Sequence, residues 1–167
     1  SGNPEMSFLC AVSQKSVLFG CLGNICRSPV AEAIFKHKVR MRGINHLFAA
    51  DSCGTSNYHI GDDPDPRALR NALKNGVPIS HKGRQLSVND LKVFDFILAM
   101  DQSNYDTILR LPDSKAYQSK VQLVRSYDPL GAGEVPDPYY GNEHDFQRVF
   151  EILDRTLENF LTLEGGL

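Results

Sequence analysis

The stretch "VLFGCLGNICRSPVAEAIF", residues 17–35, decides the fold predicted for this chain. An apolar run of strand length ends at Cys21, a short turn follows, and Pro29 stands where a helix can begin, because proline is favoured at the first helical position. Ser28, directly before it, is a suitable N-cap residue. The pattern predicts a strand, a loop and a helix, with a cysteine at the carboxyl end of the strand.

The same alternation of strand and helix continues along the chain. The expected strands are residues 16–20, 46–51, 94–100 and 121–124, and the helical patterns between them cover residues 29–42, 64–75 and 102–110. Near-continuous apolar strands are typical of parallel strands covered on both faces. Right-handed crossovers then predict an open α/β sheet, in which ligands bind beyond the carboxyl ends of the strands. Cys21 lies at such an end.

The last helix has the clearest pattern. Behind Asn142, a candidate N-cap residue, apolar residues recur at spacings of three and four: Phe146, Val149, Phe150, Leu153, Leu157, Phe160 and Leu161. The apolar residues expected on the two earlier helices are Val30, Ile34, His37 and Met41, then Leu69 and Leu73. Gly43 and Gly76 follow these helices where C-caps belong. We expect the final stripe to pack on the sheet.

Length and composition fit one domain. The chain has 167 residues, of which 41% are hydrophobic and 23% charged, values that are ordinary for a globular protein and allow one substantial core. We predict a single domain over residues 15–167. Residues 1–14 show no sustained periodicity, and Ser1-Gly2 is typical of tag removal. We expect these residues to be an N-terminal extension, disordered or in part tag-derived.

Charge and cysteine content exclude several classes of protein. The net charge of −2 gives no basic field for nucleic acid. No apolar run reaches the roughly 18–20 residues of a membrane span, and no secretory signal pattern opens the chain. Four cysteines are too few for a disulfide scaffold in a chain of this length. We therefore expect a cytoplasmic protein without a membrane span.

The loop after Cys21 has the features of an oxyanion site. Its backbone N–H groups can converge with the helix N-terminus into an anion-binding nest, an environment in which cysteines ionise readily. Arg27 adds a planar guanidinium that matches two oxygens of a phosphate. A cysteine six residues before an arginine is a weak motif by itself, but its place between a strand and a helix favours nucleophilic attack on a bound phosphoryl group.

Nucleotide and metal sites have less support. The loop lacks both the Gly-Lys-Ser/Thr ending of a Walker loop and the G-x-G-x-x-G of a dinucleotide-binding loop. Cys21 and Cys26 are five residues apart and no second close Cys/His pair follows, which disfavours zinc. We predict neither a metal nor a cofactor.

Four strings together resemble the low-molecular-weight protein tyrosine phosphatases, or acid phosphatases. They are "VLFGCLGNICRSPVAEAIF", "DSCGTSNYHIG" (51–61), "MDQSN" (100–104) and "DPYYG" (137–141), within a similarity that covers about residues 15–164. The resemblance implies a three-layer sandwich in which an open, Rossmann-like, four-stranded parallel sheet is flanked by helices. It also implies metal-independent hydrolysis of protein phosphotyrosine and of small aryl phosphate monoesters.

The same resemblance assigns roles to individual residues. Cys21 is similar to the nucleophile that forms a phosphocysteine, Arg27 to the clamp on the phosphate oxygens, and Asp137 to the general acid that later acts as base. The supporting residues are Asn24, Ser28, Ser52, His81 and Asp101, with Ser28 expected to donate to the thiolate and Asp101 to orient His81. The phosphate-binding loop is Leu22, Gly23, Asn24, Ile25, Cys26, Arg27 and Ser28.

The resemblance extends to the substrate pocket and to redox control. Ile25, Tyr58, Tyr139 and Tyr140 are similar to pocket walls deep enough to exclude the shorter phosphoserine. Cys26 is similar to a second cysteine that forms a disulfide with the nucleophile under oxidant. The expected partners are phosphotyrosine-containing proteins and inorganic phosphate or other oxyanions, and we expect a monomer or weak self-association.

Three other functions stay open. Arsenate reductases on this scaffold need further cysteines near residues 85–100, where this chain has none. Protein-arginine phosphatases typically carry threonine at the place of Ile25. A non-catalytic phosphate-binding module would keep Arg27 but could lose Cys21 or Asp137, both of which are present.

Overall fold

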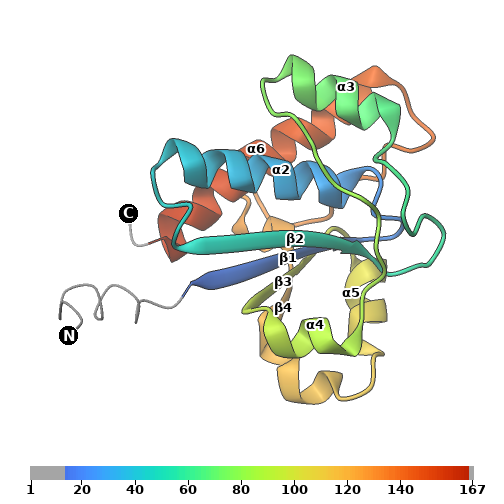
Figure 1. Cartoon of the computed structure of the whole chain (residues 1–167), viewed down its shortest axis with the longest axis vertical. Coiled ribbons are helices and arrows are strands. Elements are labelled where there is room, and N and C mark those ends of the chain that lie inside the picture. Colours follow the sequence, from blue (N-terminus) through green and yellow to red (C-terminus); the bar gives the residue numbers. More distant parts are fainter. Residues whose placement is uncertain (1–13, 166–167) are drawn as a thin grey trace, which may run out of the picture.

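Four parallel strands form one sheet in the computed structural model, which describes residues 14–165 (Figure 1). Their order across the sheet is β2 (Phe48–Gly54), β1 (Lys15–Cys21), β3 (Phe96–Ala99) and β4 (Val121–Leu123). β1 pairs directly with β3 as well as with β2, so the strand order reverses here, and open sheets bind ligands at such points. The predicted open α/β sheet is confirmed. The extension expected over residues 1–14 lies, residue 14 apart, outside the described residues.

Helices cover both faces of the sheet, which gives the three expected layers (Figure 1). On one face lie α2 (Arg27–Met41) and α6 (Glu143–Glu164), with α3 (Pro66–Lys74) packed against α6; on the other lie α4 (Val88–Val93) and α5 (Gln102–Leu109). Two 3₁₀ helices, η1 (Ser114–Lys120) and η2 (Val124–Tyr127), flank β4. Among the described helices, none has the length and apolar character needed to cross a membrane.

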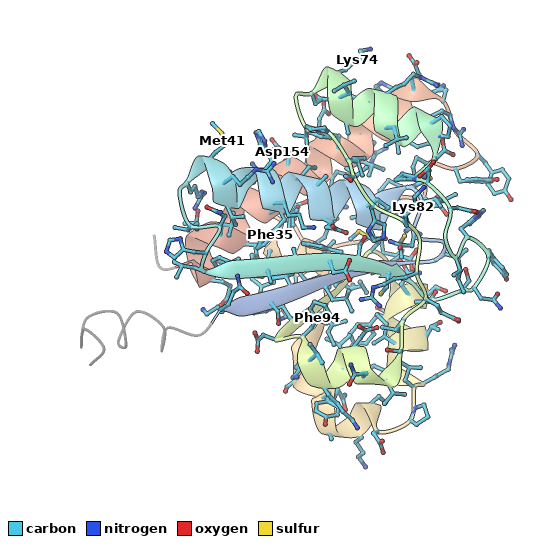
Figure 2. The ribbon with its side chains drawn as sticks, viewed as in Figure 1. Phe35, Met41, Lys74, Lys82, Phe94 and Asp154 are labelled. Carbon is cyan, nitrogen blue, oxygen red and sulfur yellow. The ribbon has the colours of Figure 1, made fainter. Side chains whose placement is uncertain are left out.

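The sheet separates two hydrophobic cores, because successive residues of a strand point to opposite faces. On one side Phe35 meets Phe19 edge-on, with 5.8 Å between ring centroids, and meets Phe160 at 5.9 Å; Figure 2 shows Phe35 between α2 and the sheet. On the other side Leu18 belongs to a cluster with Leu91. Both faces of β1 are therefore buried, as its apolar run predicts. Packing on both sides holds in place the end of the strand at Cys21.

The first helix starts earlier than predicted. α2 begins at Arg27 with Cys26 at the N-cap position, so the predicted N-cap at Ser28 is wrong. The Ser28 hydroxyl is engaged by the side chains of Cys21 and Asn24 instead of a backbone N–H. At the other end of α2, Met41 is 74% exposed and projects away from the fold (Figure 2), so the buried face of this helix ends before that residue.

The next helix, α3, buries a different face from the one expected. α3 packs Ala68 and Ala72 inward, whereas Leu73 is 65% exposed; small side chains allow a helix to approach its neighbour closely. The C-cap prediction is confirmed at both glycines, Gly43 and Gly76, which have φ values of +69° and +79°. α4 was not predicted, since it has only six residues and depends on a capping box between Ser87 and Asp90.

The last helix confirms its prediction. α6 starts directly after Asn142, whose side chain accepts a hydrogen bond from the His144 N–H. Every residue of the predicted apolar stripe is buried: Phe146, Val149, Phe150, Leu153, Leu157, Phe160 and Leu161. Its spacing at three and four residues matches one face of a helix.

Asp128 joins α6 to the segment after η2 through a buried ion pair. Its side chain accepts hydrogen bonds from Arg125 at 2.9 Å, from Arg155 at 3.0 Å and from the Leu130 N–H at 2.9 Å. Burial alone would raise the pKa of this carboxyl, but the bonds from Arg155, Leu130 and Arg125 outweigh burial and lower its pKa to about 2.

Acid should therefore weaken the fold through Asp128. A carboxyl with a lower pKa in the folded chain stabilises it above the unfolded pKa of about 3.9, here by about 2 kcal/mol, and loses this contribution as the pH falls towards the folded value. The measurement is the free energy of urea unfolding against pH for the parent and Asp128→Asn. We expect the gap between the two proteins to be widest near about pH 6 and to narrow below about pH 4. A gap independent of pH would contradict this assignment.

Candidate active site

Residues 22–26 form a tight loop between the end of β1 and the start of α2. The Ile25 carbonyl accepts a hydrogen bond from the Asp65 N–H at 2.8 Å, which holds the loop from outside. Asn24 has a φ of 59°, a left-handed conformation that asparagine tolerates better than most residues. In the described part of the chain, no acceptor is bonded to the N–H groups of residues 22–26. These groups are therefore available to an oxyanion at the start of α2.

Gly54, at the end of β2, lets this loop come close to the sheet. A Cβ atom at that position would lie 2.9 Å from the Leu22 carbonyl oxygen and 3.3 Å from the Asn24 Cβ. Any side chain there would push the loop away. The loop conformation thus depends on a residue more than twenty-five positions later in the chain.

The Cys21 sulfur lies at the bottom of this loop, 3% exposed. Its Sγ is 2.9 Å from the Ser28 Oγ, and the Ser28 Oγ in turn accepts a hydrogen bond of 2.8 Å from the Asn24 side chain. A hydroxyl that donates to a sulfur stabilises its charged form. Ser28 and Cys21 are thus within hydrogen-bond distance, and the Ser28 hydroxyl also lies 3.3 Å from the Cys53 carbonyl oxygen, a second acceptor.

Arg27 is buried beside the cysteine and is held by two acceptors. Its guanidinium donates to the Asp101 carboxylate at 2.7 Å and to the Val135 carbonyl at 3.0 Å. Burial alone would lower the pKa of Arg27, but the Cys21 sulfur, Asp101 and Asp137 outweigh it and raise that pKa. Arg27 is thus a permanent cation, oriented from behind by a carboxylate.

Asp101 does not have the contact predicted for it. We expected it to orient His81, but its carboxylate bonds to Arg27 and to the N–H of Asn104 in the first turn of α5. Its position after β3, which neighbours β1, places it beside Arg27. The imidazole of His81 is held by Glu32 instead, with its Nδ1 3.2 Å from the Glu32 Oε1.

The remaining supporting residues form a buried network beneath the loop. The Asn24 side chain donates to the Ser52 Oγ at 3.0 Å, and its oxygen lies 2.7 Å from the His81 Nε2. Ser52 donates to Glu32 at 2.7 Å. Asn24, Ser52 and His81 are therefore brought together, and the network fixes the strained residue of the loop. Sequence reasoning missed Glu32, although a charged residue among the apolar residues of 29–35 was a signal.

Glu32, Asp51 and His81 also form a group with the chemistry of a metal site. One ligand atom from each lies within 4.8 Å of the others. Glu32 already accepts from Ser52, and Asp51 is paired with Arg84 at 2.8 Å. These atoms are committed to hydrogen bonds and ion pairs, so the group has the character of a supporting network.

A cavity of about 300 Å³ opens above the cysteine. The residues that line it are Cys21, Leu22, Gly23, Ile25, Cys26, Arg27, Tyr58, His59, Asp137, Tyr139 and Tyr140. All four residues expected in the substrate pocket therefore line one cavity. Its volume is at the lower end of small-ligand sites, which suits a phenyl phosphate.

Asp137 lies at the rim of the cavity, where its side chain is partly exposed to solvent. Its Oδ2 is 3.7 Å from the Arg27 guanidinium, its side chain is 45% exposed, and its Oδ1 accepts a hydrogen bond from the Tyr139 N–H at 3.1 Å. A carboxyl group there can exchange protons with both solvent and a ligand in the cavity. The arrangement thus brings a cysteine sulfur, a guanidinium, the N–H groups of the loop and a carboxyl group around one space.

Comparison with known proteins agrees with this geometry. The family model described as "Low molecular weight phosphotyrosine protein phosphatase" matches residues 16–164, and the chain belongs to this family. A Homo sapiens protein with the same name is 44% identical over 148 residues, which cover 88% of this chain and 94% of that protein. The Schizosaccharomyces pombe member is 45% identical over 147 residues, covering 87% and 94%.

A solved structure shows the same architecture. A crystal structure of a protein tyrosine phosphatase from Entamoeba histolytica, with Hepes in its active site, is 38% identical to this chain. It aligns with a TM-score of 0.85 and covers 92% of this chain and 100% of that one. The expected three-layer fold and the family resemblance are both confirmed.

Proposed function

We propose that this protein hydrolyses phosphotyrosine in proteins, and small aryl phosphate monoesters, through a phosphocysteine intermediate and without metal or cofactor. One observation carries the proposal: Cys21, Arg27 and Asp137 surround a single cavity whose rim is lined by tyrosines. The two steps of the proposed reaction follow from the groups that line this cavity.

The first step transfers the phosphoryl group to sulfur. The loop N–H groups and Arg27 hold the phosphate oxygens while the Cys21 thiolate attacks phosphorus. The S–P bond forms as the P–O bond to the phenol breaks, and Asp137 gives its proton to the departing oxygen. The products are a phosphocysteine, a free tyrosine side chain and the Asp137 carboxylate.

The second step returns the enzyme to its starting state. The Asp137 carboxylate takes a proton from water as the water oxygen attacks phosphorus, and the S–P bond breaks. Inorganic phosphate leaves, the Cys21 thiolate is restored, and Asp137 is protonated again. Ser28, 2.9 Å from the sulfur, supports the thiolate both as nucleophile and as leaving group.

The cavity walls support an aromatic ester as substrate. Tyr58 and Tyr139 can contact the ring of a phosphotyrosine whose phosphate reaches the loop. A phosphoserine is too short to reach Cys21 past these side chains. Ile25 in the cavity lining also favours an aromatic ester over phosphoarginine. The absence of cysteines in residues 85–100 leaves an arsenate reductase without its relay.

The test is release of phosphate from matched peptides that carry phosphotyrosine, phosphoserine or phosphoarginine, in the presence of a chelator. We expect turnover of the phosphotyrosine peptide alone. Faster turnover of the phosphoarginine peptide than of the phosphotyrosine peptide would identify a protein-arginine phosphatase. Binding of inorganic phosphate without any turnover would identify a phosphate-binding module.

We further propose a cytoplasmic location, since a thiolate nucleophile needs a reducing compartment. We propose a monomer or a weakly self-associating protein. Tyr140 is 96% exposed and Tyr139 is 40% exposed, and both are available to a protein substrate or to a second copy.

We propose that Cys26 protects the nucleophile from irreversible oxidation. Burial, followed by the nearby Asp65, Cys21 and Asp137, raises the pKa of Cys26, so it is a neutral thiol in the resting enzyme. Peroxide oxidises Cys21 to a sulfenic acid and is itself reduced to water; the Cys26 sulfur then displaces water to form a disulfide. A thiol reductant restores both cysteines.

Cys26→Ser should therefore recover poorly after peroxide. The measurement is the fraction of activity regained with dithiothreitol after a timed peroxide pulse, with Cys53→Ser as the matched control because Cys53 is buried and lies outside the cavity lining. We expect near-complete recovery of the parent and the control. Equal recovery of activity in Cys26→Ser and in the parent would contradict a protective role for Cys26.

A further inference from the structure

Arg67 lies at the start of α3, outside the cavity lining, and it bonds both to Asp65 and to the segment that follows Asp137. Its backbone N–H and its Nε both donate to one oxygen of Asp65, at 2.8 and 3.1 Å, and its Nη2 donates to the other at 2.8 Å. The Asp65 carboxylate is nearly buried, with 9% of its side chain exposed. The bonds from Nε and Nη2 to the Asp65 carboxylate thus fix the orientation of the guanidinium.

The other side of the guanidinium holds the segment that follows Asp137. Nη2 donates to the Tyr139 carbonyl at 2.9 Å, and Nη1 donates to the Gly141 carbonyl at 3.3 Å. The guanidinium carbon also lies 4.7 Å from the Phe146 ring centroid, a cation–π distance. A planar fork can bond to two carbonyls and a carboxylate together, which lysine cannot do.

These contacts connect the phosphate loop to the carboxyl group at the rim. The Asp65 N–H donates to the Ile25 carbonyl in the loop at 2.8 Å. Asp65 binds Arg67, Arg67 binds the Tyr139 carbonyl, and the Tyr139 N–H donates to the Asp137 Oδ1 at 3.1 Å. One continuous series of hydrogen bonds therefore runs from Ile25 in the loop to Asp137.

The segment before Asp137 has a separate anchor. The Val135 N–H donates to the Met100 carbonyl at 2.8 Å, and the Val135 carbonyl accepts from Arg27. After Asp137, the side chains of Tyr139 and Tyr140 are exposed. The hydrogen bonds from Arg67 to Tyr139 and Gly141 connect this exposed segment to α3.

We propose that Arg67 is a positioning residue, which holds the Asp137 carboxyl at the place where it protonates the leaving group. The inference rests on the proposed function. Arg67 lies outside the cavity lining, so it has no direct role at the nucleophile. Loss of Arg67 should then harm proton donation much more than attack by Cys21.

Leaving-group dependence separates these two effects. A tyrosine phenolate needs protonation as it departs, whereas dinitrophenolate departs without it. For Arg67→Met we expect kcat/KM to fall about 10- to 100-fold on a phosphotyrosine peptide and less than about threefold on 2,4-dinitrophenyl phosphate. Arg67→Lys keeps the charge but not the fork, and should lie between the parent and Arg67→Met on the peptide.

Arg70→Met is the matched control. Arg70 is exposed one turn further along α3, and it has no hydrogen bond or ion pair with the residues the structure describes. Arg70→Met removes the same charge as Arg67→Met, and it should leave kcat/KM on both substrates within about twofold of the parent value. The inhibition constant of inorganic phosphate, which depends on the loop and Arg27, should stay unchanged in every variant.

The outcomes are distinct. The positioning role is supported if the loss of kcat/KM grows with the basicity of the leaving group. This loss is measured in Arg67→Met, or in Arg67→Lys if Arg67→Met does not fold. An equal loss on both substrates, or no loss, overturns it. Failure of the parent to hydrolyse phosphotyrosine would contradict the proposed function instead.

Discussion

Replacing Cys21 by serine abolishes phosphate release from a phosphotyrosine peptide and leaves phosphate binding in place. Serine fits the buried site 2.9 Å from the Ser28 hydroxyl, but its hydroxyl is not ionised near neutral pH and cannot replace the thiolate. Arg27 and the loop N–H groups remain. We expect kcat/KM to fall by about 10⁴-fold or more, measured with a phosphotyrosine peptide, while calorimetry still detects binding of inorganic phosphate.

Cys53→Ala controls for the loss of a buried thiol. Cys53 is 1% exposed on β2, and burial raises its pKa well above the ordinary value, so its sulfur has no place in the chemistry. This variant should keep a kcat/KM close to that of the parent. Measurable turnover by Cys21→Ser at more than about a hundredth of the parent rate would mean that another group attacks phosphorus.

Replacing Asp137 by alanine has the second-largest effect. In the proposed mechanism this carboxyl donates the proton to the leaving phenolate, so we expect kcat/KM on a phosphotyrosine peptide to fall about 10²- to 10⁴-fold. On 2,4-dinitrophenyl phosphate, formation of the phosphocysteine should be nearly unchanged, since that leaving group needs no proton. Hydrolysis of the intermediate should slow, because the base for water is missing. Stopped-flow release of dinitrophenolate separates the two steps.

Asp63→Ala is the matched control for this variant. It alters another Asp-Pro pair of the chain, but Asp63 is exposed and bonds to Lys82 on the surface. Surface ion pairs contribute little, so activity should stay at the parent level. A uniform loss across leaving groups in Asp137→Ala would assign the residue to substrate binding in place of proton transfer.

The strands could be predicted because both of their faces are buried. β1 carries Phe19 into one core and Leu18 into the other, so its apolar run is continuous and ends where the loop begins. α6 was equally clear, since apolar residues recur at spacings of three and four along its 22 residues. α4 was missed because six residues are too few to show a period, and its stability comes from a capping box.

The candidate site was harder, because its contacts join distant positions. Asp101 and Arg27 are 74 residues apart, and only the pairing of β1 with β3 brings them together. Periodicity gives no information on such a contact, and the assignment made from the family resemblance linked Asp101 to His81 instead. The same holds for Arg67 and Tyr139, 72 residues apart. Asp137 itself was selected only by resemblance, since Asp-Pro occurs at four places in the chain.

The most direct test of the account is to trap the phosphate on Cys21. Asp137→Ala is mixed with 2,4-dinitrophenyl phosphate and quenched in acid, and the phosphorylated residue is located by mass spectrometry of the peptide that carries residues 17–35. We predict phosphate on the Cys21 sulfur, at close to one per protein molecule, and none in Cys21→Ser. A burst of dinitrophenolate without phosphate on Cys21, or with phosphate on another residue, would contradict the central claim.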